Sequence, residues 1–121
     1  VMRSGDDVPR VADDALLADA LMEMTRAGLG MTAIVDADGR IVGIYTDGDL
    51  RRSLASGCNF STGRIADVMS RNPKTIHASA LAVEAAEMME RMRISELLVA
   101  GPDGQLVGAL NHHDLMRAKV I

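Results

Sequence analysis

The feature that most constrains the fold of this chain is an internal repeat with a period of 65 residues. When the sequence is shifted by 65 positions, residues 11–52 align with residues 76–117 without a gap. The identical pairs are Ala15/Ala80, Leu16/Leu81, Ala20/Ala85, Met24/Met89, Arg26/Arg91, Asp38/Asp103, Gly39/Gly104, Val42/Val107, Gly43/Gly108, Asp49/Asp114, Leu50/Leu115 and Arg52/Arg117. One supersecondary unit therefore occurs twice. Because such a unit buries little apolar surface alone, we expect the two copies to pack against each other.

Each copy has the pattern of a strand, a helix, two strands joined by a tight turn, and a second helix. In the first copy, Asp14 is a candidate N-cap of the first helix and Gly28 is its expected end. The expected strands lie at residues 9–12, 31–35 and 41–46, and at 74–77, 97–100 and 105–110. The closing helices are expected to end at residue 55 and near residue 119. The predicted fold class is therefore α/β (α+β), with two β-α-β-β-α repeats related by a pseudo-twofold axis.

The repeat also predicts the boundaries within the chain. Residues 1–56 form the first repeat, 57–64 a linker rich in turn-forming residues, and 65–121 the second repeat. Residues 64–69 are expected to form a short helix that leads into the second repeat. The end of this lead-in, Asp67-Val68-Met69, is matched at the N-terminus only by Val1-Met2. We therefore expect the chain to begin inside a lead-in, with more of the protein upstream.

Composition limits the class of partner. Hydrophobic residues make up 48% of the 121 residues, which is enough for a core, and no run of 18 apolar residues predicts a membrane span. Aromatic residues are only 2% and the net charge is -4, so a nucleic-acid surface is not expected. The single cysteine, Cys58, cannot form an internal disulfide, which favours a reducing, cytoplasmic setting.

The sharpest local signal is the junction between a strand and a helix at residues 43–49. Thr46 and Asp49 stand three residues apart, as in a capping box, where both side chains satisfy N–H groups of the first helical turn. The same residues also suit a nucleotide cradle, in which the Asp49 carboxylate accepts hydrogen bonds from a ribose diol. The spacing alone leaves both interpretations open.

The second copy of this junction carries Asn111, His112, His113 and Asp114. Adjacent histidines point in different directions at a helix start, and no further cluster completes a coordination set, so no metal site is expected. A cationic or hydrogen-bonding role for His113 fits better. No nucleophile elbow or phosphate-binding P-loop occurs, so we predict no catalytic residues and no enzyme activity of this chain by itself.

The repeat and the Gly-x-x-Thr-x-x-Asp junction together resemble the CBS domain, and two of them a tandem CBS pair, over essentially the whole chain. A narrower resemblance links it to the C-terminal part of bacterial D-arabinose 5-phosphate isomerases, through residues 28–32, 45–52, 65–69 and 113–118. In that family an upstream sugar isomerase domain interconverts ribulose 5-phosphate and arabinose 5-phosphate. The product leads to 3-deoxy-D-manno-octulosonate (Kdo) of lipopolysaccharide. The resemblance therefore implies a regulatory module attached to an isomerase domain.

CBS pairs bind nucleotides in clefts between their repeats, and the family pattern implies which residues serve here. The first cleft would use Met31, Thr32, Ala33, Thr46 and Asp49, with Arg93 and His113 meeting the phosphate. The second cleft would use Glu96, Leu97, Leu98, Asn111 and Asp114, with Gly28 and Gly48 where the first has cations. Because an anion in a partly desolvated cleft needs charged donors, the first cleft is the predicted site.

The resemblance also suggests the effector. CMP-Kdo, the activated product of the route, would offer a cytidine ribose, a phosphate and a carboxylate, and an adenine nucleotide is the alternative. If His113 faces the anion, affinity should rise as pH falls. A different class of function remains open, in which the module binds no ligand and assembles a homo-oligomer by stacking. The helices ending in Leu54 and Met116 would then face another subunit.

Overall fold

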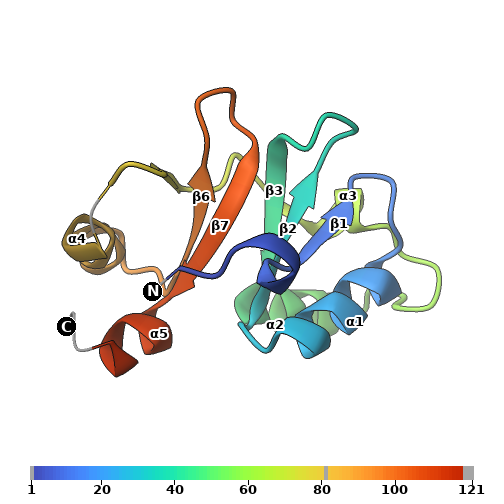
Figure 1. The fold of residues 1–121 in the computed structure, drawn as a ribbon. Coiled ribbons are helices and arrows are strands. Elements are labelled where there is room, and N and C mark those ends of the chain that lie inside the picture. The colour runs from blue at the N-terminus through green and yellow to red at the C-terminus, as the bar shows by residue number, and fades with distance from the viewer. Residues whose placement is uncertain (1, 81, 119–121) are drawn as a thin grey trace. The chain divides into compact units, whose positions relative to one another are not determined.

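The computed structural model describes residues 2–80 and 82–118. The chain forms two compact units by its internal contacts (Figure 1). The first-repeat unit is Pro9–Pro73, and the second-repeat unit joins Val1–Val8 to Lys74–Ile121. The N-terminal segment thus groups with the second repeat, and the segment after residue 56 groups with the first. None of the helices in the described part of the chain is long and apolar enough to cross a membrane.

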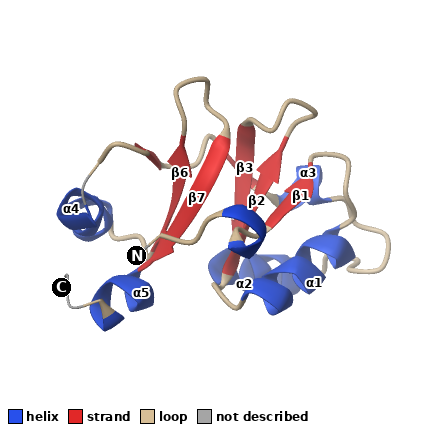
Figure 2. Ribbon diagram, viewed as in Figure 1, coloured by secondary structure: helices blue, strands red, loops and turns tan. Residues whose placement is uncertain are grey.

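The first-repeat unit is a four-stranded sheet with helices (Figure 2). Its elements are β1 (Arg10–Ala12), α1 (Leu17–Ala27), β2 (Met31–Val35), β3 (Ile41–Thr46), α2 (Asp47–Ala55), α3 (Ile65–Val68) and β4 (Ser70–Arg71). The strand order is β1-β2-β3-β4, with β1 parallel to β2 and the other pairs antiparallel. The predicted strand-helix-strand-strand-helix pattern is confirmed, and β4 adds a strand that the pattern did not include.

The second-repeat unit reproduces this arrangement with a three-stranded sheet in the order β5-β6-β7. Its elements are the 3-10 helix η1 (Gly5–Asp7), β5 (Thr75–His77), α4 (Ala82–Met92), β6 (Glu96–Ala100), β7 (Leu106–Asn111) and α5 (His112–Arg117). The hairpin registers also repeat, because Met31 pairs with Thr46 and Glu96 pairs with Asn111. Leu81 and the predicted helix end near residue 119 lie outside the described residues.

The start of α1 differs from the prediction. Asp14 is not the N-cap, because Leu16 holds that position with an extended backbone and no side chain caps the helix. The backbone N–H groups of Asp19 and Ala20 instead donate to the carbonyl of Leu16. The predicted end is confirmed, since Gly28 adopts a left-handed φ of 68° and its N–H donates to the carbonyl of Met24.

Each hairpin receives a short segment that precedes the other repeat in sequence. β4 pairs with β3 in the first-repeat unit, and Arg3 pairs with β7 in the second through backbone hydrogen bonds of 2.8 and 3.0 Å. Next to each pairing, a methionine side chain lies against a glycine of the hairpin strand. A Cβ added to Gly43 would lie 2.5 Å from the sulfur of Met69, and one added to Gly108 would lie 2.5 Å from the sulfur of Met2. The repeated glycines therefore leave room for this close approach.

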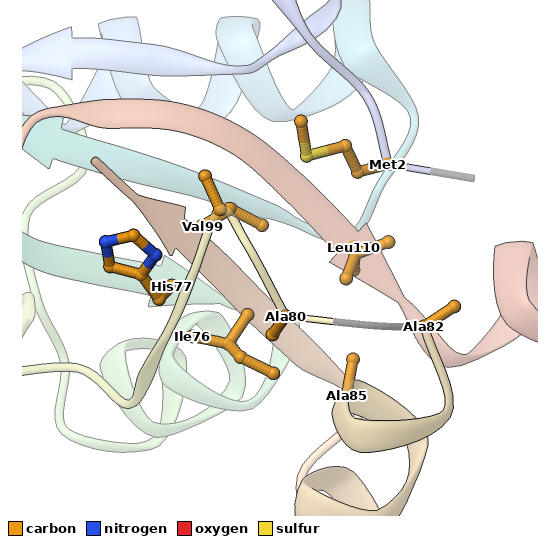
Figure 3. Close-up of a pocket in the computed structure, with 9 residues that line it drawn as sticks. Met2, Ile76, His77, Ala80, Ala82, Ala85, Val99 and Leu110 are labelled. Carbon is orange, nitrogen blue, oxygen red and sulfur yellow. The ribbon is translucent and has the colours of Figure 1, made fainter. Parts of the chain in front are cut away.

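The cores of the two units are filled differently. In the first-repeat unit, Leu17 and Tyr45 are fully buried. The repeat aligns them with the smaller Ala82 and Leu110. In the second-repeat unit, these two residues line a hollow of about 220 Å³, together with Ile76, Ala80, Ala85 and Val99 (Figure 3). Substitution of large side chains by small ones between the repeats thus accounts for the hollow.

Candidate functional site

The junction of β3 and α2 is a complete capping box. The hydroxyl oxygen of Thr46 accepts from the Asp49 N–H at 3.3 Å, and Oδ2 of Asp49 accepts from the Thr46 N–H at 2.9 Å. The Thr46 hydroxyl also lies 3.2 Å from the same Oδ2 and donates to it. The capping interpretation is therefore confirmed, and it fixes the Asp49 carboxylate at the end of the strand.

The second oxygen of Asp49 is also occupied. Oδ1 accepts from Arg52 Nη2 at 2.5 Å and from the Ser70 hydroxyl at 3.0 Å. A carboxylate offers about four acceptor positions, and these donors use them. The Arg52 side chain is 72% exposed, whereas that of Asp49 is 5% exposed. Because the Arg52 side chain is largely exposed and can return to water, Arg52 is the partner that a ligand hydroxyl could replace at the lowest cost.

The three predicted residues of β2 lie beside this junction. Met31 pairs with Thr46 across the hairpin, and Thr32 and Ala33 follow toward the middle of the sheet. All three are fully buried, and the Thr32 hydroxyl donates to the carbonyl of Ala33 at 3.2 Å. The structure thus brings the five first-repeat residues together, with the β2 side chains in the core and the polar groups supplied by Thr46 and Asp49.

The corresponding residues of the second repeat form a different set of contacts. Asn111 caps α5 by accepting from the Asp114 N–H at 2.7 Å, and Glu96 pairs with Asn111 across the hairpin. Leu97 and Leu98 are fully buried. The Asp114 carboxylate accepts from Arg3 Nε at 3.1 Å and from Arg3 Nη2 at 3.4 Å.

Sequence reasoning missed the two residues that reach these carboxylates from outside the junctions, Arg3 and Ser70. Both come from the short segments that pair with β7 and β3. A signal for them was present, because the match of Val1-Met2 with Val68-Met69 also aligns Arg3 with Ser70. These two residues are therefore equivalent in sequence and in place.

The two predicted cationic residues, Arg93 and His113, both lie exposed in the second-repeat unit. His113 is in the first turn of α5. Arg93 follows α4 with a left-handed φ of 55°, at the position that the repeat aligns with Gly28. A non-glycine residue in this region is strained and persists where its surroundings or its function require it.

Arg93 borders a hollow of about 330 Å³ between the end of α4 and the start of α5. Glu90, Ser95 and His112 supply other polar side chains around it. The His112 N–H donates to the carbonyl of Ser95 at 2.8 Å, which ties the start of α5 to the start of β6. Sequence reasoning did not include Ser95 and His112 in a site. Among the described residues, no group of three or more His, Cys, Asp or Glu side chains gathers as a metal site.

Comparison with known proteins defines the class. The model of the CBS domain matches residues 1–56 and 65–121, so the chain belongs to the CBS domain family. Solved structures agree on the fold. A CBS domain protein from Pyrobaculum aerophilum complexed with AMP is 23% identical with a TM-score of 0.83, covering 95% of this chain and 86% of its own. The CBS domain pair of protein MJ0100, in complex with 5'-methylthioadenosine and S-adenosyl-L-methionine, is 23% identical with a TM-score of 0.84, covering 98% and 94%.

The chain is also similar to curated relatives of one kind. The arabinose 5-phosphate isomerase KdsD of Pseudomonas aeruginosa is 48% identical over all 121 residues, and that of Escherichia coli K12 is 45% identical over the same length. This chain spans 37% of the length of each of these relatives. It is a CBS domain pair similar to theirs, and the rest of each relative has no counterpart in this sequence.

Proposed function

We propose that this chain is the effector-binding CBS pair of an arabinose 5-phosphate isomerase and that its effector is a nucleotide or a nucleotide sugar. The identity of 48% and 45% to KdsD proteins over the whole chain supports the first part. Support for the second part comes from CBS proteins of the same fold that are described in complex with AMP or with S-adenosyl-L-methionine. The isomerase reaction itself would belong to a separate domain.

The observation that carries the proposal is the backbone of Arg93. Its φ of 55° is costly for arginine, and the aligned position of the first repeat holds glycine. The side chain is exposed, so packing in a core does not explain why arginine stands there. An anionic group that needs a charged donor does explain it.

In this proposal, the first repeat binds the ribose and the second supplies positive charge. The junction at Thr46 and Asp49, with β2 beside it, holds the nucleoside, and a ribose hydroxyl takes the place of Arg52 at Oδ1. Arg93 and His113 meet the phosphate, as the CBS family pattern implies.

CMP-Kdo is the first candidate effector. It carries a cytidine ribose for Asp49 and both a phosphate and a carboxylate for the two cations. As the activated product of a route that begins with arabinose 5-phosphate, it is a reasonable feedback signal for the isomerase domain. Regulation then requires that CMP-Kdo binds two conformations of the whole protein unequally. AMP is the second candidate, because two CBS structures of this fold are described with AMP.

A thermal-shift panel with CMP-Kdo, CMP, AMP and arabinose 5-phosphate tests the proposal. A ligand that binds only the folded chain stabilises it by about 2.7 kcal/mol at a concentration of 100 times Kd. We expect CMP-Kdo to raise Tm, Asp49→Asn to abolish the increase, and the matched Asp114→Asn to retain it. Asparagine at residue 49 keeps one acceptor oxygen for the Thr46 N–H, and circular dichroism checks that both variants are folded.

Other outcomes separate the alternatives. An increase with AMP alone would replace feedback control with adenine-nucleotide sensing. If no compound changes Tm, the effector proposal fails and the assembly interpretation remains. That interpretation is supported by the exposure of Leu54 and Met116, and analytical ultracentrifugation of Leu54→Asp and Met116→Asp variants would test it.

A further inference from the structure

The carboxylate of Asp114 already has an arginine partner from a distant part of the chain. Arg3 Nε lies 3.1 Å from Oδ2 and Arg3 Nη2 lies 3.4 Å from Oδ1, so one guanidinium faces both oxygens. The side chains are 34% and 11% exposed. A guanidinium in this position uses the same two acceptors that a ribose diol would need.

The equivalent carboxylate in the first repeat has a different kind of arginine partner. Arg52 reaches only Oδ1 of Asp49, comes from the same helix, and is 72% exposed. The segment that pairs with β3 contributes the small hydroxyl of Ser70 in place of a guanidinium. The two repeats therefore differ in the residue that this segment presents to the aspartate.

The backbone around Arg3 keeps its side chain at this position. Its N–H donates to the carbonyl of Ala109 at 2.8 Å, and its carbonyl accepts from the Ala109 N–H at 3.0 Å. Met2 lies across Gly108, where any side chain would collide with it. Because these bonds fix the backbone of Arg3, only the side-chain torsions remain to be ordered in the ion pair.

A ligand at Asp114 would have to separate this pair. A largely exposed arginine that contacts one oxygen, such as Arg52, is replaced at low cost, whereas an arginine that contacts both oxygens, such as Arg3, is not. We propose that the Arg3 guanidinium occupies the position at Asp114 where the diol of a nucleotide would bind, and so blocks that site. The chain then binds one nucleotide and not two. The choice of nucleotides as ligands rests on the proposed function, whereas the closure by Arg3 does not.

Exchange of the two equivalent residues tests the inference. Arg3→Ser gives the second repeat the hydroxyl that the first one has, and Ser70→Arg gives the first repeat the guanidinium of the second. Arg3→Ala serves as a further opening variant. Isothermal titration with CMP and with AMP counts the sites, and circular dichroism confirms that each variant is folded. The wild-type chain should bind one nucleotide, Arg3→Ser and Arg3→Ala two, and Ser70→Arg none.

Second substitutions locate the new site. In the Arg3→Ser background, Asp114→Asn should return the stoichiometry to one, and Asp49→Asn should leave only the new site. A stoichiometry that stays unchanged in both Arg3→Ser and Arg3→Ala would overturn the inference. Weaker nucleotide binding by these two variants would also overturn it, because Arg3 would then be a ligand-binding group. If the wild-type chain binds no nucleotide but the opening variants bind one, the closure of Asp114 by Arg3 stands, whereas the single wild-type site and the proposed function fail.

Discussion

Replacement of Arg93 by glycine should separate the stability of the fold from binding of the effector. The left-handed backbone at Arg93, with φ of 55°, costs a non-glycine residue about 1–3 kcal/mol. Glycine removes this cost but gives the unfolded chain more freedom, which offsets about 0.4–1 kcal/mol. We therefore expect Arg93→Gly to leave the free energy of unfolding unchanged or to raise it by about 1–2 kcal/mol.

The same substitution removes a charged donor from the proposed anion site. A hydrogen bond to a charged group contributes about 1.5–3 kcal/mol, which corresponds to a loss of affinity of about 10- to 150-fold. Urea denaturation measures the first effect, and isothermal titration with CMP-Kdo measures the second. Stability should thus be kept or raised while affinity falls, whereas a variant that merely damaged the fold would lose both stability and affinity.

The first repeat offers a matched control. Gly28 has a φ of 68°, and a Cβ added to it would contact nothing within 4 Å. Gly28→Ala therefore measures the backbone strain without a collision and should destabilise the chain by about 1 kcal/mol. If Arg93→Gly lowers the free energy of unfolding by more than that, or leaves affinity unchanged, the reasoning about Arg93 is wrong.

Three further predictions concern the cores of the repeats. Leu17→Ala should destabilise the chain by about 2–5 kcal/mol in urea denaturation, whereas Ala82→Leu, which fills the hollow of the second repeat, should not; equal losses would contradict the assigned packing. Burial raises the pKa of Tyr45, whose hydroxyl donates to Ser53 at 2.9 Å, so stability present below about pH 10 should be lost as pH rises through the folded pKa. Tyr45→Phe should remove this alkaline loss of Tm and cost about 1 kcal/mol at neutral pH; an unchanged alkaline profile would refute the cause. Gly43→Ala should lower Tm, because its Cβ would meet a sulfur at 2.5 Å, and an unchanged Tm would contradict that contact.

Local signals in the sequence predicted the hairpins well. β2 and β3 have the predicted bounds, because β-branched residues are bounded there by glycines and by an Asp-Gly turn. The start of α1 was predicted wrongly, since Asp14 resembles an N-cap but the chain is still in a turn after β1 at that point. The short strand β4 carries no pattern of its own, and its pairing with β3 depends on contacts distant in sequence.

In the candidate site, too, local features were predictable from the sequence and contacts between distant residues were not. The capping box of Thr46 and Asp49 spans four residues and was predictable from spacing alone. The contacts of Ser70 with Asp49 and of Arg3 with Asp114 join residues 21 and 111 positions apart, so no local pattern contains them. Only the comparison of the two repeats could have suggested them, because it aligns the segments that precede each copy.

Backbone amide NMR of the chain during titration with CMP-Kdo would test the central claim most directly. The account predicts saturable chemical-shift changes that are largest at residues 31–33 and 46–49 and at Arg93, with no comparable change at residues 111–112 and 114. Asp49→Asn should remove these changes, and Asp114→Asn should not. Saturable changes confined to the second-repeat junction at residues 111–114, or no saturable change at the highest effector concentration, would contradict it.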